Sequence, residues 1–173
     1  MLVWRIARAP YTSLDGETAR RRGARWNSRG RSRVYTSRHA SLAALELLVH
    51  VEPADVPDDL RLLGIEIPDD LEPKALSLTL LPRDWQTMPA PTSTQAIGDA
   101  WLATGTSALL VVPSIVMQHE QNYLVNPAHP DARRISITSN DPFAFDPRRL
   151  GDPTCEPTRR GLRRLSASVR FPQ

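Results

Sequence analysis

The sequence predicts a single domain of the α+β class. Its 173 residues suit one domain, and a composition of 40% hydrophobic and 24% charged residues is typical of a globular chain. Segments with the pattern of strands outnumber those with the pattern of helices, and the two kinds do not alternate regularly along the chain. This order favours α+β over a doubly wound parallel fold.

The N-terminal part is predicted to contain two short strands joined by a polar, arginine-rich segment. Residues 2–6 and residues 34–36 have the apolar and β-branched composition of strands. Residues 8–24 have the glycines and polar run of a loop. Eight arginines are concentrated in the connecting region: Arg20, Arg21, Arg22, Arg25, Arg29, Arg31, Arg33 and Arg38.

Residues 41–51 form the clearest predicted helix, because they include a run of strong helix formers. Ser37 or Ser41 is placed to cap the start of this helix, and Pro53 is placed to end it.

The remaining elements are one helix and several strands. Residues 92–103 have the pattern of a second helix, with Gly105 just past its end as a C-cap. Residues 108–112 are continuously apolar, which indicates a central buried strand. Four further segments are predicted as strands: residues 62–67, 75–81, 135–138 and 143–145.

Composition narrows the class of protein. Cys155 is the only cysteine, so the chain forms no internal disulfide and no cysteine-rich metal site. The four histidines show no His-x-x-x-His spacing, and we expect no metal. No stretch approaches the roughly 20 apolar residues that span a bilayer, and arginines interrupt the opening segment. We therefore expect a cytoplasmic protein that does not enter a membrane.

The basic residues are almost all arginine, since Lys74 is the only lysine in a chain of net charge +3. Arginine binds phosphate groups in a fork, which suggests either a nucleic acid or a small phosphorylated ligand as partner. Genomic base composition is an equally simple source of this bias. With only 6% aromatic residues and no recognised nucleic-acid motif, direct nucleic-acid binding is not expected.

Glu46 is a charged residue on the otherwise apolar stripe of the first predicted helix, which consists of Leu42, Leu45 and Val49. His50 follows four residues later, so that the two side chains can meet on one helix face. Burying a carboxylate costs free energy unless the group is paired or has a function. Two interpretations remain open: a catalytic carboxylate, or an edge residue that forms an ion pair with one of the arginines.

Three further polar residues lie where ligands commonly bind. Arg25 stands beside an aromatic residue and an amide, so its guanidinium can hold a phosphate; a solvated basic loop is the alternative. Ser114 follows the most apolar strand, a common place for a ligand contact and also an ordinary place for a serine. Asn122 begins a polar, turn-rich segment and can orient either a loop or a ligand.

Taken in order, these segments resemble the RES-domain family over roughly residues 2–150. The resemblance is carried by Trp4-Arg5, Gly23-Ala24-Arg25-Trp26-Asn27, Val34-Tyr35-Thr36-Ser37, Ser41-Leu42-Ala43-Ala44-Leu45-Glu46 with His50, Trp101, Val112-Pro113-Ser114, Asn122-Tyr123-Leu124-Val125-Asn126-Pro127 and Phe145-Asp146-Pro147-Arg148. Each motif alone is weak, whereas their order and spacing together are specific.

The resemblance implies a fold like that of ADP-ribosyltransferases, with a twisted, split β core and flanking helices around a cleft for NAD+. It implies that residues 1–150 form an NAD-binding catalytic domain and leaves residues 151–173 as a basic tail, flexible or docked on a partner. The implied catalytic set is Arg25, Tyr35, Glu46 and Ser114. The residues implied to bind NAD+ are Arg25, Tyr35, Ser114, His50 and Asn122.

The resemblance also implies a toxin of a type II toxin–antitoxin system. Such a toxin cleaves the nicotinamide–ribose bond of NAD+ by hydrolysis or phosphorolysis, depletes NAD+ and arrests growth, while an Xre-like helical antitoxin covers the active site. A mono-ADP-ribosyltransferase that modifies a protein through the same site is the first alternative. A basic nucleic-acid-binding or ribonuclease toxin is the second, and a non-catalytic interaction module is the third.

Overall fold

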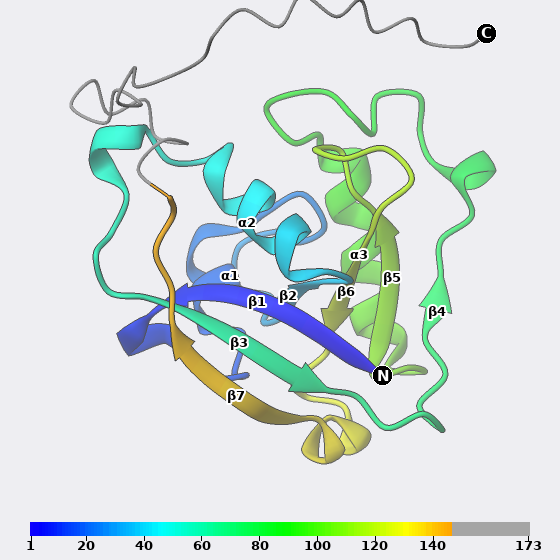
Figure 1. Ribbon diagram of the computed structural model, residues 1–173. Coiled ribbons are helices and arrows are strands. Elements are labelled where there is room, and N and C mark those ends of the chain that lie inside the picture. Colours follow the sequence, from blue (N-terminus) through cyan, green and yellow to red (C-terminus); the bar gives the residue numbers. More distant parts are fainter. Residues whose placement is uncertain (147–173) are drawn as a thin grey trace, which may run out of the picture.

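A computed structural model describes residues 1–146 of the chain (Figure 1). Residues 151–173, predicted as a basic tail, lie outside the described residues. The described part contains three α-helices and one seven-stranded sheet. The helices are α1 (Glu17–Arg22), α2 (Ala40–Leu48) and α3 (Thr92–Thr104). The strands are β1 (Leu2–Arg8), β2 (Val34–Ser37), β3 (Leu60–Glu66), β4 (Lys74–Ala75), β5 (Leu109–Pro113), β6 (Gln121–Val125) and β7 (Ser136–Pro142).

The sheet has the strand order β4-β5-β6-β2-β1-β3-β7. Neighbouring strands are antiparallel except β4 and β5, which are parallel. β1 pairs with β3 along its whole length, whereas β1 and β2 share a single register pair, Trp4 with Ser37. The sheet is therefore nearly divided at this seam. The predicted α+β class with a split β core is confirmed.

Helices α2 and α3 cover one face of the sheet. Side chains alternate along each strand, so Leu110, Val112 and Leu124 share a face and form a buried cluster with Trp101 of α3. Burial of each such side chain stabilises the fold by about 1.5–3 kcal/mol. In Figure 1, α2 lies over the seam, with β5, β6 and α3 on one side and β1, β3 and β7 on the other. The opposite face holds the larger apolar core, which includes Val3, Val34, Leu63, Ile65, Leu109 and Val125.

A buried ion pair fastens the arginine-rich segment to α3. The Arg33 side chain is fully buried, and its Nη2 donates to Asp99 Oδ1 at 3.1 Å. Its guanidinium also lies 5.8 Å from the centre of the Trp101 ring. Ser28 donates both its backbone amide and its hydroxyl to Asp99. Burial lowers the pKa of Arg33, because a charged guanidinium is less stable away from water. Asp99 is its counterion, and loss of Asp99 would leave this buried charge unpaired.

The predicted loop at residues 8–24 is wrong in part, because it contains α1 and a 3-10 turn at Ala9–Tyr11. The Glu17 carboxylate binds Arg20 and Arg21 one turn later, and these pairs stabilise a helix that buries none of its residues. Because α1 has no apolar stripe, its sequence lacks the periodicity by which a helix is recognised.

The first predicted helix is confirmed, but its ends are wrong. It begins after His39 rather than after a capping serine, and His39 makes no side-chain cap bond. It ends at Leu48, before residues 49–51 and Pro53. The second helix is confirmed, and Gly105 adopts the expected left-handed conformation at its C-cap, with φ 56°.

Three strand predictions need correction. Of residues 75–81, only Ala75 belongs to a strand; Leu78 and Leu80 lie in a 3-10 turn and are 64% and 80% exposed. A single strand, β7, replaces the two predicted at residues 135–138 and 143–145. The sequence favours a turn-rich segment where the structure has β6, because this strand opens with the polar pair Gln121 and Asn122. The predicted central strand is confirmed as β5. No helix among residues 1–146 is long and apolar enough to span a membrane.

Replacing Gly98 with alanine is expected to lower the free energy of unfolding by about 1–3 kcal/mol. An added Cβ would overlap the Trp26 carbonyl oxygen and the Arg33 guanidinium, and the backbone oxygen cannot move without displacing its segment. Chemical denaturation followed by circular dichroism measures the change. Ala100→Ser, at an exposed position of the same helix, is the control and should change stability by less than about 0.5 kcal/mol. Equal stability of the two variants would contradict the close contact.

Candidate active site

Polar side chains from three strands meet beneath α2, on the face that the helices cover. Ser37 of β2 and Asn122 of β6 are register partners, and Asn122 is also opposite Val112 of β5. Ser114 follows β5 on the same face as Val112, two residues on. Ser37, Asn122 and Ser114 therefore form a polar row at one end of an otherwise apolar face.

Glu46 of α2 binds this row through one carboxylate oxygen. Its Oε1 accepts from Ser114 Oγ at 2.8 Å and from Asn122 Nδ2 at 2.6 Å. No hydrogen bond to Oε2 occurs among residues 1–146. Hydrogen bonds to an ionised group are short and strong, so the two donors fix the orientation of the carboxylate. The interpretation of Glu46 as an edge residue in an ion pair with arginine is not what the geometry shows.

The Ser114 hydroxyl is fully engaged. Besides donating to Glu46, it accepts from the backbone amides of Val116 and Met117, each at 3.1 Å. A serine hydroxyl has one proton to donate and two lone pairs to accept with. Ser114 therefore links the carboxylate to the turn that follows β5.

The Tyr35 hydroxyl is also engaged within the protein. It donates to Asn27 Oδ1 at 2.8 Å and accepts from the backbone amide of Trp26 at 3.1 Å. Burial raises the pKa of Tyr35 well above its usual range, so the phenol stays protonated at physiological pH. Tyr35 thus holds the segment that carries Arg25, and its ring packs against the apolar cluster that contains Leu124.

Arg25 reaches across to the loop that precedes α3. Its Nη1 donates to the carbonyl oxygen of Trp85 at 2.6 Å, and its Nη2 donates to that of Thr87 at 3.0 Å. Burial lowers the pKa of Arg25, and the negative charge of Glu46 acts in the opposite direction. Among residues 1–146, no carboxylate forms an ion pair with Arg25. The site therefore contains a cation without a contact counterion, within electrostatic reach of a carboxylate.

The structure does not bring His50 together with Glu46. Because α2 ends at Leu48, His50 lies beyond the helix, its side chain is exposed, and no hydrogen bond joins it to Glu46. Ser114 and Asn122 are the residues that orient the carboxylate. The structure thus places Ser114 and Asn122 in contact with Glu46, and Arg25 within electrostatic reach of both Glu46 and Tyr35.

Two further residues, Ser37 and Asn27, are hydrogen-bonded to the site residues Asn122 and Tyr35, and the sequence does not predict them as site residues. The sequence suggests Ser37 as a helix cap and as part of a motif, and Asn27 as part of a motif. Ser37 Oγ donates to Asn122 Oδ1 at 2.8 Å, and Asn27 Nδ2 donates to the carbonyl oxygens of Ala19, Ser28 and Arg31. Both side chains are buried. A buried polar residue is a recognisable signal only once its burial is known.

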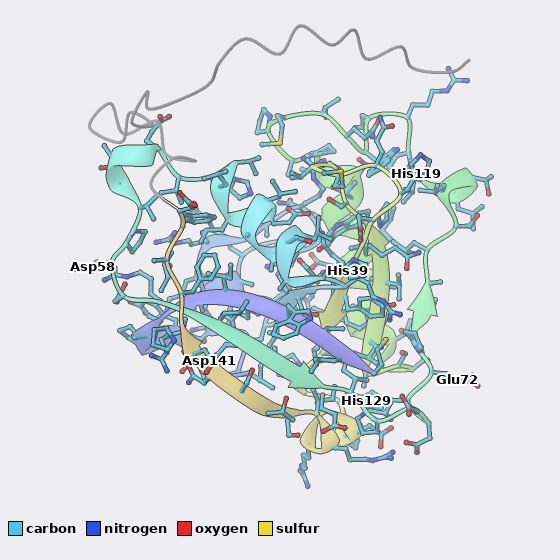
Figure 2. All side chains as sticks on the ribbon, in the orientation of Figure 1. His39, Asp58, Glu72, His119, His129 and Asp141 are labelled. Atoms are coloured by element: carbon cyan, nitrogen blue, oxygen red, sulfur yellow. The ribbon has the colours of Figure 1, made fainter. Side chains whose placement is uncertain are left out.

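No group of three or more His, Cys, Asp or Glu residues that could hold a metal ion occurs within the described chain. His39, His119 and His129 lie apart from one another in Figure 2. His39 instead contacts Glu120, with Nδ1 2.9 Å from Oε2, and so joins the start of α2 to the turn before β6.

Comparison with known sequences gives one family and several curated relatives. The RES domain matches residues 2–146. A protein of Sphingobium sp. named "Prs ADP-ribosylating toxin" is 37% identical over 153 residues, which cover 85% of this chain and 95% of that protein. A "Toxin Res" of Yersinia enterocolitica is 36% identical, over 86% of this chain and 99% of its own length. A "Toxin Res" of Pseudomonas putida is 38% identical, over 82% and 94%.

Comparison with solved structures supports the fold. The crystal structure of the M. tuberculosis MbcT–MbcA toxin–antitoxin complex contains a chain that matches with a TM-score of 0.69. The match covers 87% of this chain and 86% of that one, at 19% sequence identity. Together with the domain match and the curated relatives, it confirms the resemblance that the motifs predicted: the chain belongs to the RES domain family.

Proposed function

We propose that the protein is a toxin that cleaves the bond between nicotinamide and ribose in NAD+. The observation that carries the proposal is the Glu46 carboxylate, which has one oxygen anchored by Ser114 and Asn122 and the other free of hydrogen bonds from residues 1–146. A relative 37% identical is named an ADP-ribosylating toxin, and ADP-ribosylation begins with cleavage of the same bond.

The chemistry requires stabilisation of positive charge at the ribose. As the bond from C1′ to the pyridinium nitrogen breaks, its electron pair leaves with nicotinamide, and the ribose becomes oxocarbenium-like. A carboxylate held in place before the reaction stabilises that cation without reorganising. Glu46 Oε2 is the atom proposed to do so. An acceptor then forms a new bond at C1′ and loses its proton, and nicotinamide leaves as a neutral ring.

The other residues are proposed to bind and orient NAD+. Arg25 would hold a phosphate oxygen or a ribose oxygen, since its charge has no contact counterion among residues 1–146. Tyr35 would contribute its ring, because its hydroxyl is bonded to Asn27 and Trp26. Ser114 and Asn122 would hold the carboxylate. His50, which the family resemblance implies as an NAD+-binding residue, is exposed beyond the end of α2 and makes no hydrogen bond to Glu46.

We propose that the physiological context is a toxin–antitoxin pair in the cytoplasm. Loss of NAD+ would arrest growth, and an Xre-like helical antitoxin would cover the site. The support is that curated relatives are named toxins and that the matching solved structure is a toxin with its antitoxin. In this proposal residues 1–150 are the catalytic unit, and residues 151–173 are available for docking on a partner.

Transfer of ADP-ribose to a protein is the second candidate, and the name of the Sphingobium relative favours it. Water, phosphate and a protein nucleophile can each act as acceptor at the same C1′ atom, so the proposed residues serve all three. A nucleic-acid role is less well supported. Arg33 is buried against Asp99 and cannot contact phosphate, and Arg20 and Arg21 form ion pairs with Glu17.

The acceptor is identified by incubating the purified protein with NAD+, with and without inorganic phosphate, and resolving the products by mass. A phosphate-dependent ADP-ribose phosphate would establish phosphorolysis, and free ADP-ribose would establish hydrolysis. Loss of NAD+ only when a cell extract is present, with a protein gaining the mass of ADP-ribose, would establish the transferase.

Glu46→Gln is expected to reduce the rate of NAD+ loss by about 10²–10³-fold while the protein remains folded. Glutamine keeps the shape of the side chain and removes the charge that stabilises the ribose cation. The rate is measured by the loss of NAD+ over time, and folding by circular dichroism. Glu52→Gln, at an exposed carboxylate near the same helix, is the matched control. Undiminished turnover by Glu46→Gln would remove Glu46 from the mechanism.

Arg25→Ala is expected to raise the KM for NAD+ by about 10–100-fold, since a hydrogen bond to a charged group is worth roughly 1.5–3 kcal/mol. Arg29→Ala removes an exposed arginine of the same segment whose one hydrogen bond within residues 1–146 is to the carbonyl oxygen of Arg22, and it should leave the KM unchanged. Steady-state kinetics of the two variants give the comparison. Equal effects would make Arg25 one surface charge among several.

A further inference from the structure

We infer that Ser37 is a positioning residue for Glu46, acting through the side-chain amide of Asn122. This inference rests on the proposed function for its effect on turnover, although the contacts themselves do not depend on it. Ser37 Oγ donates to Asn122 Oδ1 at 2.8 Å, and Asn122 Nδ2 donates to Glu46 Oε1 at 2.6 Å. The three side chains form one continuous chain of hydrogen bonds from the sheet to the carboxylate.

The chemistry of the three side chains sets the direction in which each hydrogen bond is donated. An asparagine amide presents an acceptor on one side and donors on the other, and a carboxylate only accepts. The donor side must therefore face Glu46, which turns the acceptor side, Oδ1, toward Ser37. A donor at that position satisfies Oδ1 and polarises the amide, which strengthens the bond from Nδ2 to Glu46. Ser37 supplies the donor.

Solvent cannot easily replace Ser37. The residue is only 4% exposed, so removal of its hydroxyl would leave Asn122 Oδ1 without a nearby donor. The amide would then be held only by its bond to Glu46, so its orientation, and with it one of the two anchors of Glu46, would be less well fixed. Ser114 would remain as the second anchor.

The backbone holds Ser37 from both sides of the seam. Its Cα is a register partner of Asn122 in β6 and, on the other side, of Trp4 in β1. The Trp4 pair is the single register pair between β1 and β2, and the backbone amide of the next residue, Arg38, donates to the carbonyl oxygen of Gln121 at 3.1 Å. The hydroxyl that orients Asn122 therefore stands where the two halves of the sheet join.

Thr36 provides a matched control on the same strand. Its hydroxyl donates to the carbonyl oxygen of Tyr123 at 2.8 Å, and the residue is 3% exposed. Since neighbouring residues of a strand face opposite sides of the sheet, Thr36 points away from Glu46. Thr36→Val thus removes a buried hydroxyl with a comparable loss of bonding and leaves the chain from Ser37 to Glu46 intact.

The first test compares steady-state NAD+ cleavage by Ser37→Ala, Ser37→Thr and Thr36→Val. Ser37→Ala should lower kcat by about tenfold, because orientation of the carboxylate matters in the transition state. Its KM should stay within about twofold, because Ser37 makes no contact with the substrate in this scheme. Ser37→Thr, which keeps the hydroxyl, should restore kcat, and Thr36→Val should leave it unchanged. Equal losses in Ser37→Ala and Thr36→Val would reduce Ser37 to a structural role.

The second test does not depend on activity. In a spectrum of side-chain amides, the Asn122 NH2 group should be protected from exchange with solvent in the wild type and in Thr36→Val, and should lose that protection in Ser37→Ala. Unchanged protection in Ser37→Ala would overturn the inference even if the protein did not act on NAD+. A full kcat in Ser37→Ala, together with an inactive Glu46→Gln, would overturn the positioning role and leave the proposed function standing.

Discussion

The Glu46 carboxylate lies between α2 and the sheet, and its hydrogen bonds constrain how these two layers meet. A partly buried carboxylate needs donors, because its desolvation is not otherwise compensated. The Ser114 hydroxyl and the Asn122 side-chain amide each donate one hydrogen bond to the same oxygen, Glu46 Oε1. Ser114 follows β5, and Asn122 lies in the neighbouring strand β6. The placement of α2 is thereby tied to the register of β5 and β6. A shift of α2 by one residue would put Leu45 or Leu47 opposite Ser114 and Asn122, and the Ser114 hydroxyl proton and the Asn122 Nδ2 group would lose their acceptor.

A second polar network positions the segment that carries Arg25. The Tyr35 hydroxyl is hydrogen-bonded to Trp26 and Asn27. The next residue, Ser28, donates to Asp99 of α3, which also forms the ion pair with the buried Arg33. These contacts place Arg25, whose own guanidinium binds the loop before α3. The sheet and the two helices therefore position an anionic group and a cationic group separately, by networks that share the short strand β2.

The sequence was informative where a pattern is local. Helix α3, strand β5 and the body of α2 follow from helix formers, a glycine cap and a continuous apolar run, and Glu46 was found as a charge on an apolar stripe. The contacts of Glu46 carry no such signal, because Asn122 and Ser37 are 85 residues apart and meet only through strand register. A pairing of His50 with Glu46 requires a helix that continues past Leu48, whereas α2 ends there. A serine just before a helix predicts a cap, and the same sequence signal accompanies the positioning role of Ser37.

The order of these elements along the chain also decides when the site comes into existence. Arg25, Tyr35 and Glu46 are synthesised early, but the donors at Ser114 and Asn122 follow 68 and 76 residues after Glu46. At a translation rate of about 5–20 residues per second, a growing chain spends several seconds with Glu46 made and the Ser114 and Asn122 donors still missing. Strand β2 likewise cannot pair with β6, its neighbour in the sheet, until β6 has been synthesised. A ribosome-bound fragment that stops short of β6 therefore carries Glu46 without the Asn122 donor, and the complete hydrogen-bonded arrangement forms only after β6 has been made.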